Sequence, residues 1–209
     1  MGWILSKISS GKHLIHDIML EQLDHKLFLA LNSCYSPFWD HVMYIISAKI
    51  TWIPLYLAII WALWLKYKRK LIIILLFVIL AVTMSDRLSV AVKNSVKRPR
   101  PCHEKTLEGM VHLVKGKCGG NYGFVSSHAS NAFMVALFSL LLIRKKWYSV
   151  VIILWALIVG YSRIYLGVHY PGDVIAGSML GALAGWFTVF LYDLTDRTCL
   201  HKSEYFTRQ

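Results

Sequence analysis

The stretch from Ser162 to Asp173 places a cation, an imidazole and a carboxylate in a short link between two apolar segments. Pro171-Gly172 separates His169 from Asp173, so the chain is expected to turn there rather than continue as helix. Asp173 would cap the following helix and could accept the Nδ1 proton of His169, which leaves the other ring nitrogen free to attack. Arg163 would neutralise the non-bridging oxygens of a phosphoryl group. The pattern indicates phosphoryl transfer; the structural alternative is a buried salt bridge between Arg163 and Asp173.

A second cluster extends from Lys93 to Pro101 and is rich in cations. Prolines on both sides of Arg100 favour an extended backbone, which would hold its guanidinium group for bidentate contact with phosphate. Lys93 would supply a further phosphate-binding charge, whereas Lys97 and Arg98 are expected to be solvated or to face lipid headgroups. The alternative is an ordinary basic patch beside the membrane.

Ser126-Ser127-His128 forms a third cluster, at the start of an apolar run. Ser126 is suited to capping the helix that follows. The free amides of Ser127 and His128 would then point at one spot, as in anion sites at helix N-termini. His128 could give a proton to a leaving oxygen. The alternatives are a purely structural cap and a polar surface histidine.

Asp86 is a carboxylate inside an apolar segment, and ionisable groups in that setting are functional candidates. It precedes Lys93 by two helical turns, so both side chains share a helix face. We expect Asp86 to support the phosphate site from beneath; pairing within its own helix and snorkelling to the interface are the alternatives.

The composition predicts an integral membrane protein. The 209 residues are 56% hydrophobic with a mean hydropathy of +0.51. Because backbone polar groups must be satisfied internally in lipid, the apolar segments predict an all-α, multi-pass transmembrane bundle with about five spans. The predicted spans are Ile50–Leu65, Leu71–Val92, Ser127–Ile143, Tyr148–Tyr161 and Val174–Tyr192.

Three regions are expected along the chain. Residues 1–49 form an interfacial region, in which residues 1–24 read as an amphipathic surface helix. Residues 26–47 could continue along the interface or enter it as a short hairpin. Residues 50–192 form the transmembrane catalytic domain, and residues 193–209 form a cytoplasmic tail.

Basic turns predict the orientation. Lys66–Lys70 and Arg144–Lys146 are compact cationic links, which the positive-inside rule places in the cytoplasm. The three polar clusters then lie on the outer face, where seven Lys or Arg and two Glu occur between Lys93 and Lys117. This excess suits a phosphate-bearing lipid headgroup. Since the formal charge of +12 is divided between two membrane faces, it gives little support to nucleic-acid binding.

Cys102 and Cys118 both lie in the predicted outer loop, where an oxidising compartment permits a disulfide. Such a bridge would restrain the loop that presents Arg100, with a loop-closure effect of roughly 3 kcal/mol. Cys34 and Cys199 are isolated. Neither the cysteine spacing nor the sparse carboxylates indicate a metal site, so we expect no metal and no cofactor.

Together the three clusters resemble the three-part signature of the type 2 phosphatidic-acid phosphatase and vanadium haloperoxidase superfamily. Lys93-x6-Arg100-Pro101, Ser126-x-His128 and Ser162-Arg163-x5-His169-x3-Asp173 agree in order, spacing and placement at span ends, over roughly residues 51–192. The second motif departs from the usual Pro-Ser-Gly-His, because this chain has Val125-Ser126-Ser127-His128.

The resemblance implies a role for each residue. His169 would be the nucleophile that forms a phosphohistidine, oriented by Asp173, and His128 would be the general acid for the leaving group. The substrate phosphate would be held by Lys93, Arg100, Ser126 and Arg163, and the amide of Ser127 at the helix start would add a further phosphate contact. The resemblance implies no metal for the phosphatase members.

The leading hypothesis is therefore a bacterial inner-membrane lipid phosphate phosphatase whose site faces the periplasm. Its substrate would be undecaprenyl diphosphate, lipid A phosphate, phosphatidylglycerol phosphate or phosphatidic acid, and the basic outer loop favours the first two. The alternative is a protein that binds or transports anionic lipids without hydrolysis. Haloperoxidase chemistry is disfavoured because those relatives are soluble. Small residues such as Gly177, Gly181 and Gly185 could pack helices within or between chains, so the sequence leaves the oligomeric state open.

Overall fold

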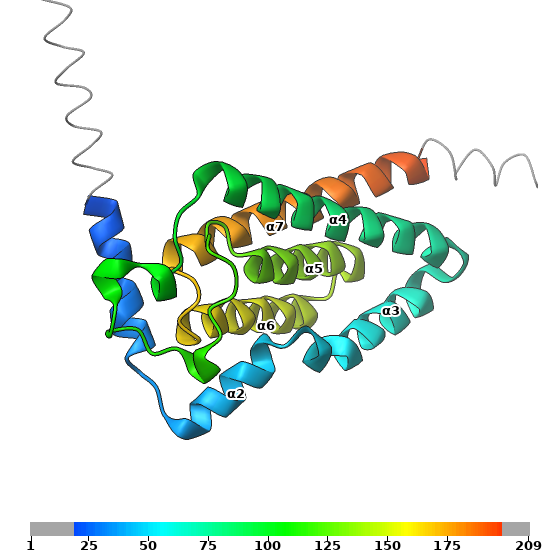
Figure 1. The fold of residues 1–209 in the computed structure, drawn as a ribbon. Helices are drawn as coiled ribbons and strands as arrows, with labels where there is room; N and C mark the ends of the chain where they lie inside the picture. Colours follow the sequence, from blue (N-terminus) through cyan, green and yellow to red (C-terminus); the bar gives the residue numbers. More distant parts are fainter. Residues whose placement is uncertain (1–18, 198–209) are drawn as a thin grey trace, which may run out of the picture.

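The computed structural model describes residues 19–197, and within this range the secondary structure is helical apart from one isolated bridge between Pro99 and Tyr122 (Figure 1). The helices are residues 19–32, α2 (Pro37–Ser47), α3 (Ile53–Tyr67), α4 (Leu71–Val96), α5 (Ser127–Ile143), α6 (Lys146–Tyr165) and α7 (Pro171–Thr195). The predicted all-helical architecture is confirmed. The expected surface helix over residues 1–24 and the tail from residue 193 lie largely outside the described residues.

Three stretches are long and apolar enough to cross a membrane: Lys49–Val96, Lys146–Tyr165 and Pro171–Thr195. The first contains both α3 and α4, which fold back on each other at a turn over Lys68–Lys70 (Figure 1). Helix α5 has the same apolar character but only 17 residues. Length and composition therefore support an integral membrane protein with three candidate spans, and the count of five remains a prediction.

Helix α5 lies inside the bundle and packs against α7, α6, α4 and α3 (Figure 1). Its closest partner is α7, which presents glycines at every fourth position. A Cβ on Gly177 would lie 2.5 Å from the Ser126 carbonyl oxygen, and one on Gly181 would overlap Ser130. In lipid, where packing rather than water exclusion joins helices, such backbone contact is the main gain. These glycines thus pack helices within the chain.

Large apolar side chains cover the outer faces of the helices, as expected for surfaces in contact with lipid. Leu57 and Trp61 of α3, Ile72 of α4, and Ile175 and Leu183 of α7 are all more than half exposed. The inner faces instead form one core of apolar side chains from α3 to α7.

The two basic turns lie together at the end of the bundle formed by the start of α4 and the end of α5. Lys66 Nζ and Tyr67 Oη donate to the Leu142 carbonyl oxygen, at 2.7 and 2.9 Å. Lys70 pairs with Asp196 at 2.7 Å, which ties this turn to the end of α7.

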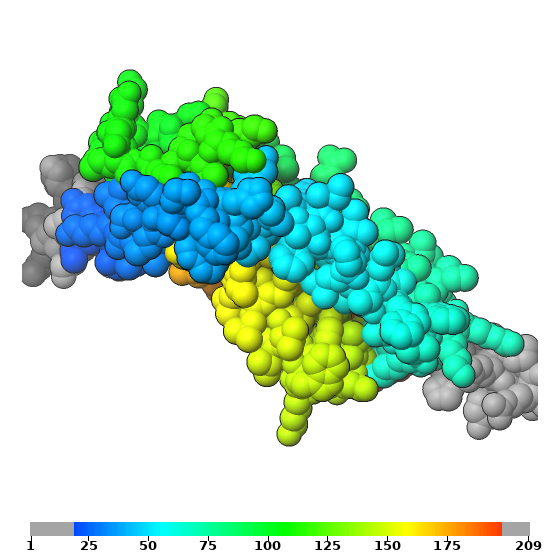
Figure 2. All heavy atoms as spheres, turned by 90° about the horizontal axis from the view of Figure 1, so that it is seen from below, coloured from blue at the N-terminus to red at the C-terminus, as the bar shows by residue number. Residues whose placement is uncertain are grey.

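The N-terminal helices lie at the other end, beside the loop that joins α4 to α5; Figure 2 shows these segments side by side. The Asn32 side chain bonds the backbones of His112, Ile164 and Tyr165 at 2.8–3.2 Å. Asp40 of α2 accepts from the Tyr165 hydroxyl at 2.8 Å and contacts His112 Nε2 at 2.9 Å. Residues 19–47 are therefore packed onto the end of α6 and the loop.

The link between α6 and α7 is shorter than predicted. Ser162 and Arg163 lie in the last turn of α6, and α7 begins at Pro171, because proline is well tolerated at the first helical position. Only residues 166–170 connect the two helices, so Arg163 and Asp173 are held on rigid elements.

Candidate active site

Four helix ends meet at one end of the bundle: the C-termini of α4 and α6 and the N-termini of α5 and α7 (Figure 1). The α4–α5 loop covers them. Its strand-like segment is fixed by two hydrogen bonds, from Arg100 N to Asn121 O at 3.2 Å and from Gly123 N to Arg98 O at 2.9 Å. This arrangement brings the three predicted clusters together.

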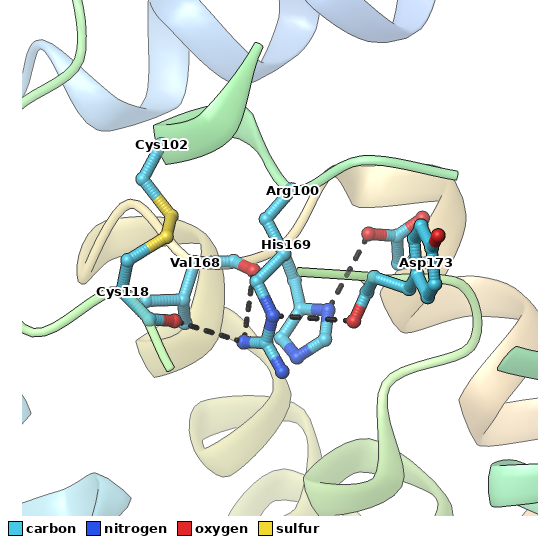
Figure 3. The surroundings of a disulfide bond; sticks show 7 residues. Arg100, Cys102, Cys118, Val168, His169 and Asp173 are labelled. Carbon is cyan, nitrogen blue, oxygen red and sulfur yellow. Dashed lines mark hydrogen bonds and ion pairs between the residues drawn. A yellow bond between two sulfur atoms is a disulfide. The ribbon is translucent and has the colours of Figure 1, made fainter. Parts of the chain in front are cut away.

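His169 and Asp173 form a buried pair, as Figure 3 shows. The distance from His169 Nδ1 to Asp173 Oδ2 is 3.3 Å, and the residues are 2% and 0% exposed. Because Nδ1 faces the carboxylate, Nε2 is the nitrogen left for attack. Burial, and after it the charges of Arg100 and Arg163, hold the pKa of His169 well below its ordinary value of 6.5, so the imidazole is neutral at physiological pH.

Asp173 is held from several sides. Its Oδ2 also accepts from the Tyr170 amide at 3.1 Å, which makes it part of the capping box at the start of α7. Its Oδ1 accepts from Arg98 Nη1 at 3.0 Å. The expectation that Arg98 is solvated or faces headgroups is therefore wrong: its side chain is 18% exposed and pairs with two carboxylates. The alternative pairing of Asp173 with Arg163 is not observed either.

The extended conformation predicted for Arg100 is confirmed, with φ −75° and ψ 157°. Its Nη1 donates to the carbonyl oxygens of Cys118 and Val168 at 3.2 and 3.4 Å, and its Nε donates to Tyr122 O at 3.2 Å. A disulfide joins Cys118 to Cys102, so the bridge holds one of the acceptors that orient the guanidinium group (Figure 3).

Arg163 and Lys93 complete the positive charge. Arg163 Nη1 donates to Ser47 Oγ of α2, and its buried Nε has no protein partner among the described residues. Lys93 Nζ donates to Ser127 Oγ at 3.3 Å. Both contacts are to neutral hydroxyls, so these two cations are left to bind an anion.

Ser126 is a buried cap rather than an exposed hydroxyl. Its Oγ accepts from Ala129 N at 3.4 Å, as its predicted capping role requires. Its amide donates to the Asp173 carbonyl oxygen at 2.9 Å, so that amide is not available to a ligand. The starts of α5 and α7 are thereby joined directly, which fixes His128 relative to His169.

Asp86 contacts α5, not Arg87 or its own helix. Its Oδ1 accepts from Asn131 Nδ2 at 2.7 Å, and Asn131 Oδ1 accepts from Ser85 Oγ at 2.7 Å. The pair positions α4 against α5 below Lys93.

The PAP2 superfamily model matches residues 70–196, more than half of the chain. The chain belongs to the PAP2 superfamily. The family named from the three motifs is confirmed.

Relatives from this superfamily are similar over most of the chain. A lipid A 4′-phosphatase of Bacteroides thetaiotaomicron is 38% identical over 85% of this chain and 81% of its own length. A lipid A 4′-phosphatase of Porphyromonas gingivalis is 38% identical over 82% of this chain and 74% of its own length. A putative undecaprenyl-diphosphatase of Escherichia coli is 29% identical over 79% of this chain and 80% of its own length.

Two crystal structures have the same PAP2 fold. Aquifex aeolicus LpxE matches with a TM-score of 0.64 at 25% identity, over 80% of this chain and 94% of that one. A Bacillus subtilis PAP2-type phosphatidylglycerolphosphate phosphatase matches with a TM-score of 0.68 at 24% identity, over 89% of this chain and 92% of that one. At this level of identity the match supports the fold alone. This PAP2 protein is a membrane lipid phosphate phosphatase, and the enzymatic hypothesis is confirmed over non-hydrolytic lipid binding.

Two cavities meet at His128 of this PAP2 protein. One, of about 390 Å³, is the more polar of the two and is lined by Arg100, Arg163 and His128 among others. The other, also about 390 Å³, is an apolar groove between α3, α4, α5 and α6. His128 and Ser47 line both, so an anionic group and a hydrocarbon chain joined to it can be held on either side of His128.

The sequence analysis did not identify four residues that contact the candidate site residues: Asp24, Ser47, Arg98 and Gly123. A signal existed for Arg98, because alternate residues of an extended chain share a face, and Arg98 is two positions before Arg100. No local pattern marks Asp24, since its partners Arg98 and Gly172 are 74 and 148 residues away along the chain.

Proposed function

We propose that this phosphatase removes a phosphate group from lipid A, at the outer face of the bacterial inner membrane, through a phosphohistidine at His169. The junction of a cationic cavity with an apolar groove at His128 carries the proposal. Such a junction suits a phosphate attached to a hydrocarbon anchor.

In the first step, His169 Nε2 attacks phosphorus and the bond from phosphorus to the lipid oxygen breaks. The neutral imidazole supplies the electron pair, and Asp173 stabilises the positive charge that develops on the ring. The leaving oxygen takes a proton from His128, which lies where the two cavities meet.

Three cations would hold the phosphate during transfer. Arg100 and Arg163 line the polar cavity, and Lys93 lies beside Ser127 at the start of α5. Their charges offset those of the non-bridging oxygens in a site partly shielded from water, where each contact is stronger. The Ser127 hydroxyl and the start of α5 add donors.

In the second step, water replaces the lipid oxygen and His128 accepts its proton. Attack of that water on phosphorus breaks the bond to His169 Nε2 and releases inorganic phosphate. The same histidine thus serves as acid and then as base, as microscopic reversibility requires.

The apolar groove would take a hydrocarbon chain of the substrate. Its lining includes Ile59, Leu63 and Val78, and it extends as far as Phe138. We place the groove within the hydrophobic layer and the polar cavity at its outer surface. The two basic turns lie together at the opposite end of the bundle, which supports the cytoplasmic placement of that end.

Lipid A is the preferred substrate because the two lipid A 4′-phosphatases resemble this chain over more than four-fifths of its length. The test is phosphate release in detergent from lipid A, undecaprenyl diphosphate, phosphatidylglycerol phosphate and phosphatidic acid. We expect fastest release from lipid A, no release by His169→Ala, and full release by the control His103→Ala in the outer loop. Lipid A labelled at its phosphate should transfer label to the protein in an acid-labile form. Faster release from another lipid would overturn the substrate, and full activity of His169→Ala would overturn the mechanism.

A further inference from the structure

Arg98 lies between two carboxylates that come from opposite ends of the chain. Its Nη1 is 3.0 Å from Asp173 Oδ1, and its Nη2 is 2.8 Å from Asp24 Oδ2. The three side chains are 18%, 0% and 15% exposed. Charges so little exposed to water are costly unless each is paired, so the two contacts of Arg98 depend on each other.

Asp24 is also fixed to the start of α7. Its Oδ1 accepts from the Gly172 amide at 2.8 Å. A Cβ at position 172 would lie 2.7 Å from Asp24 Oδ2, so a glycine is needed for this approach. The carboxylate therefore occupies the helix N-terminus one residue before Asp173, where negative charge is favoured.

Tyr170 holds the same arrangement from a third side. The Arg98 guanidinium carbon lies 4.0 Å from the centre of the Tyr170 ring, and His25 stacks on that ring at 4.8 Å. The Tyr170 amide donates to the Asp173 oxygen that faces His169. Arg98 and Tyr170, which both donate to Asp173, are thus packed against the helix of residues 19–32.

The charges of the three side chains have a consequence for catalysis. Arg98 alone would offset the negative potential of Asp173 at His169, which stabilises the ring when it becomes positive. With Asp24 present, one cation is shared by two anions, and one net negative charge remains. Electrostatic support that is already in place costs no reorganisation during the reaction.

We propose that Arg98 and Asp24 are positioning residues of the phosphatase: Arg98 orients the Asp173 carboxylate toward His169, and Asp24 offsets the charge of Arg98 so that the negative potential at His169 is retained. The inference rests on the proposed role of His169 as nucleophile. It places part of the catalytic apparatus outside residues 70–196, the range that the PAP2 superfamily model matches.

The test compares Asp24→Asn, Arg98→Gln and the double variant by steady-state hydrolysis of lipid A in detergent. Each single substitution should lower kcat about 10- to 100-fold, the range typical of residues that orient a reacting group, with KM changed less than about threefold. In the Arg98→Gln background, Asp24→Asn should change kcat less than about threefold, because no cation is left to balance. A purely structural role would instead give additive losses and lower thermal stability.

The controls are Lys97→Gln, a neighbouring exposed cation, and Glu21→Gln, an exposed carboxylate on the same helix as Asp24. Both should retain kcat within about twofold. Additive effects, or wild-type kcat in both single variants while His169→Ala is inactive, would overturn the inference and leave the proposed function standing. If Arg98→Gln does not fold, Asp24→Asn alone decides, since it keeps the shape of the side chain. Activity of His169→Ala would instead refute the proposed mechanism.

Discussion

Gly123 lies directly against Asp173: a Cβ on this glycine would be 2.8 Å from Asp173 Oδ2 and 3.6 Å from His169 Nδ1. The loop backbone thus closes over the pair formed by His169 and Asp173. Because Asp173 is held by Arg98 and by the Tyr170 amide, it has little freedom to move away.

Gly123→Ala should therefore lower kcat about tenfold or more, by displacing the carboxylate from His169. Overpacking of this kind also costs about 1–3 kcal/mol of stability. Gly120→Ala is the matched control, since a Cβ there would meet nothing within 4 Å. Equal phosphate release by the two variants would contradict the geometry.

Loss of the disulfide should weaken phosphate binding. In Cys102→Ser, the Cys118 carbonyl oxygen that accepts from Arg100 is no longer tethered, so we expect a several-fold rise in KM and a loss of roughly 3 kcal/mol in stability. Reduction of the wild type should reproduce both effects. Cys34→Ser, which removes an exposed free thiol, should leave KM and melting temperature unchanged.

Substitution of Gly181 should separate α5 from α7. A Cβ at this position overlaps the backbone of Ser130, so Gly181→Ala should lower stability by about 1–3 kcal/mol or more, equivalent to a fall of roughly 2–12 °C in melting temperature. Gly160→Ala should be milder, because its Cβ would meet only a Val174 methyl group at 3.0 Å. A smaller loss for Gly181→Ala than for Gly160→Ala would refute the packing argument.

The buried imidazole predicts a pH dependence of stability. The pKa of His169 is well below 6.5 in the folded protein, chiefly because of burial, whereas in the unfolded chain it is about 6.5. Below pH 6.5 the unfolded state binds a proton that the folded state does not. The free energy of unfolding therefore decreases as the pH is lowered. His169→Gln removes this titration. Between pH 7 and pH 5 the variant should become more stable relative to wild type in thermal unfolding. A difference independent of pH would show that His169 titrates normally in the fold.

Hydropathy predicted the helices, and motif spacing identified the three clusters that the structure brings together at one end of the bundle. The predicted start of α5 coincides with the observed Ser127, because Ser126 combines a capping side chain with the onset of an apolar run. The extended backbone at Arg100 followed from its flanking prolines. The end of α6 was placed too early, at Tyr161, since polar residues there were read as a link although Ser162 and Arg163 fit a helical turn.

The remaining contacts depend on tertiary structure. Residues 19–47 carry no motif, and only the folded chain brings Asp24 to Arg98 and Asn32 to the end of α6. Arg98 appeared to be one more cation in a basic stretch because its partners are distant in sequence. Local sequence patterns identify the residues of the three motifs. The residues that position those motif residues are brought into contact only by packing between segments distant in sequence.

The bond from Gly172 to Asp24 also has a consequence for biosynthesis. The two residues are 148 positions apart, and the ribosome makes Asp24 long before the start of α7. An unfinished chain that ends before α7 therefore contains His169 but lacks the Asp173 carboxylate that orients it. On the proposed mechanism, turnover at the full rate requires that α7 has been inserted and that the helix of residues 19–32 has docked onto its start, so membrane insertion times the onset of full activity.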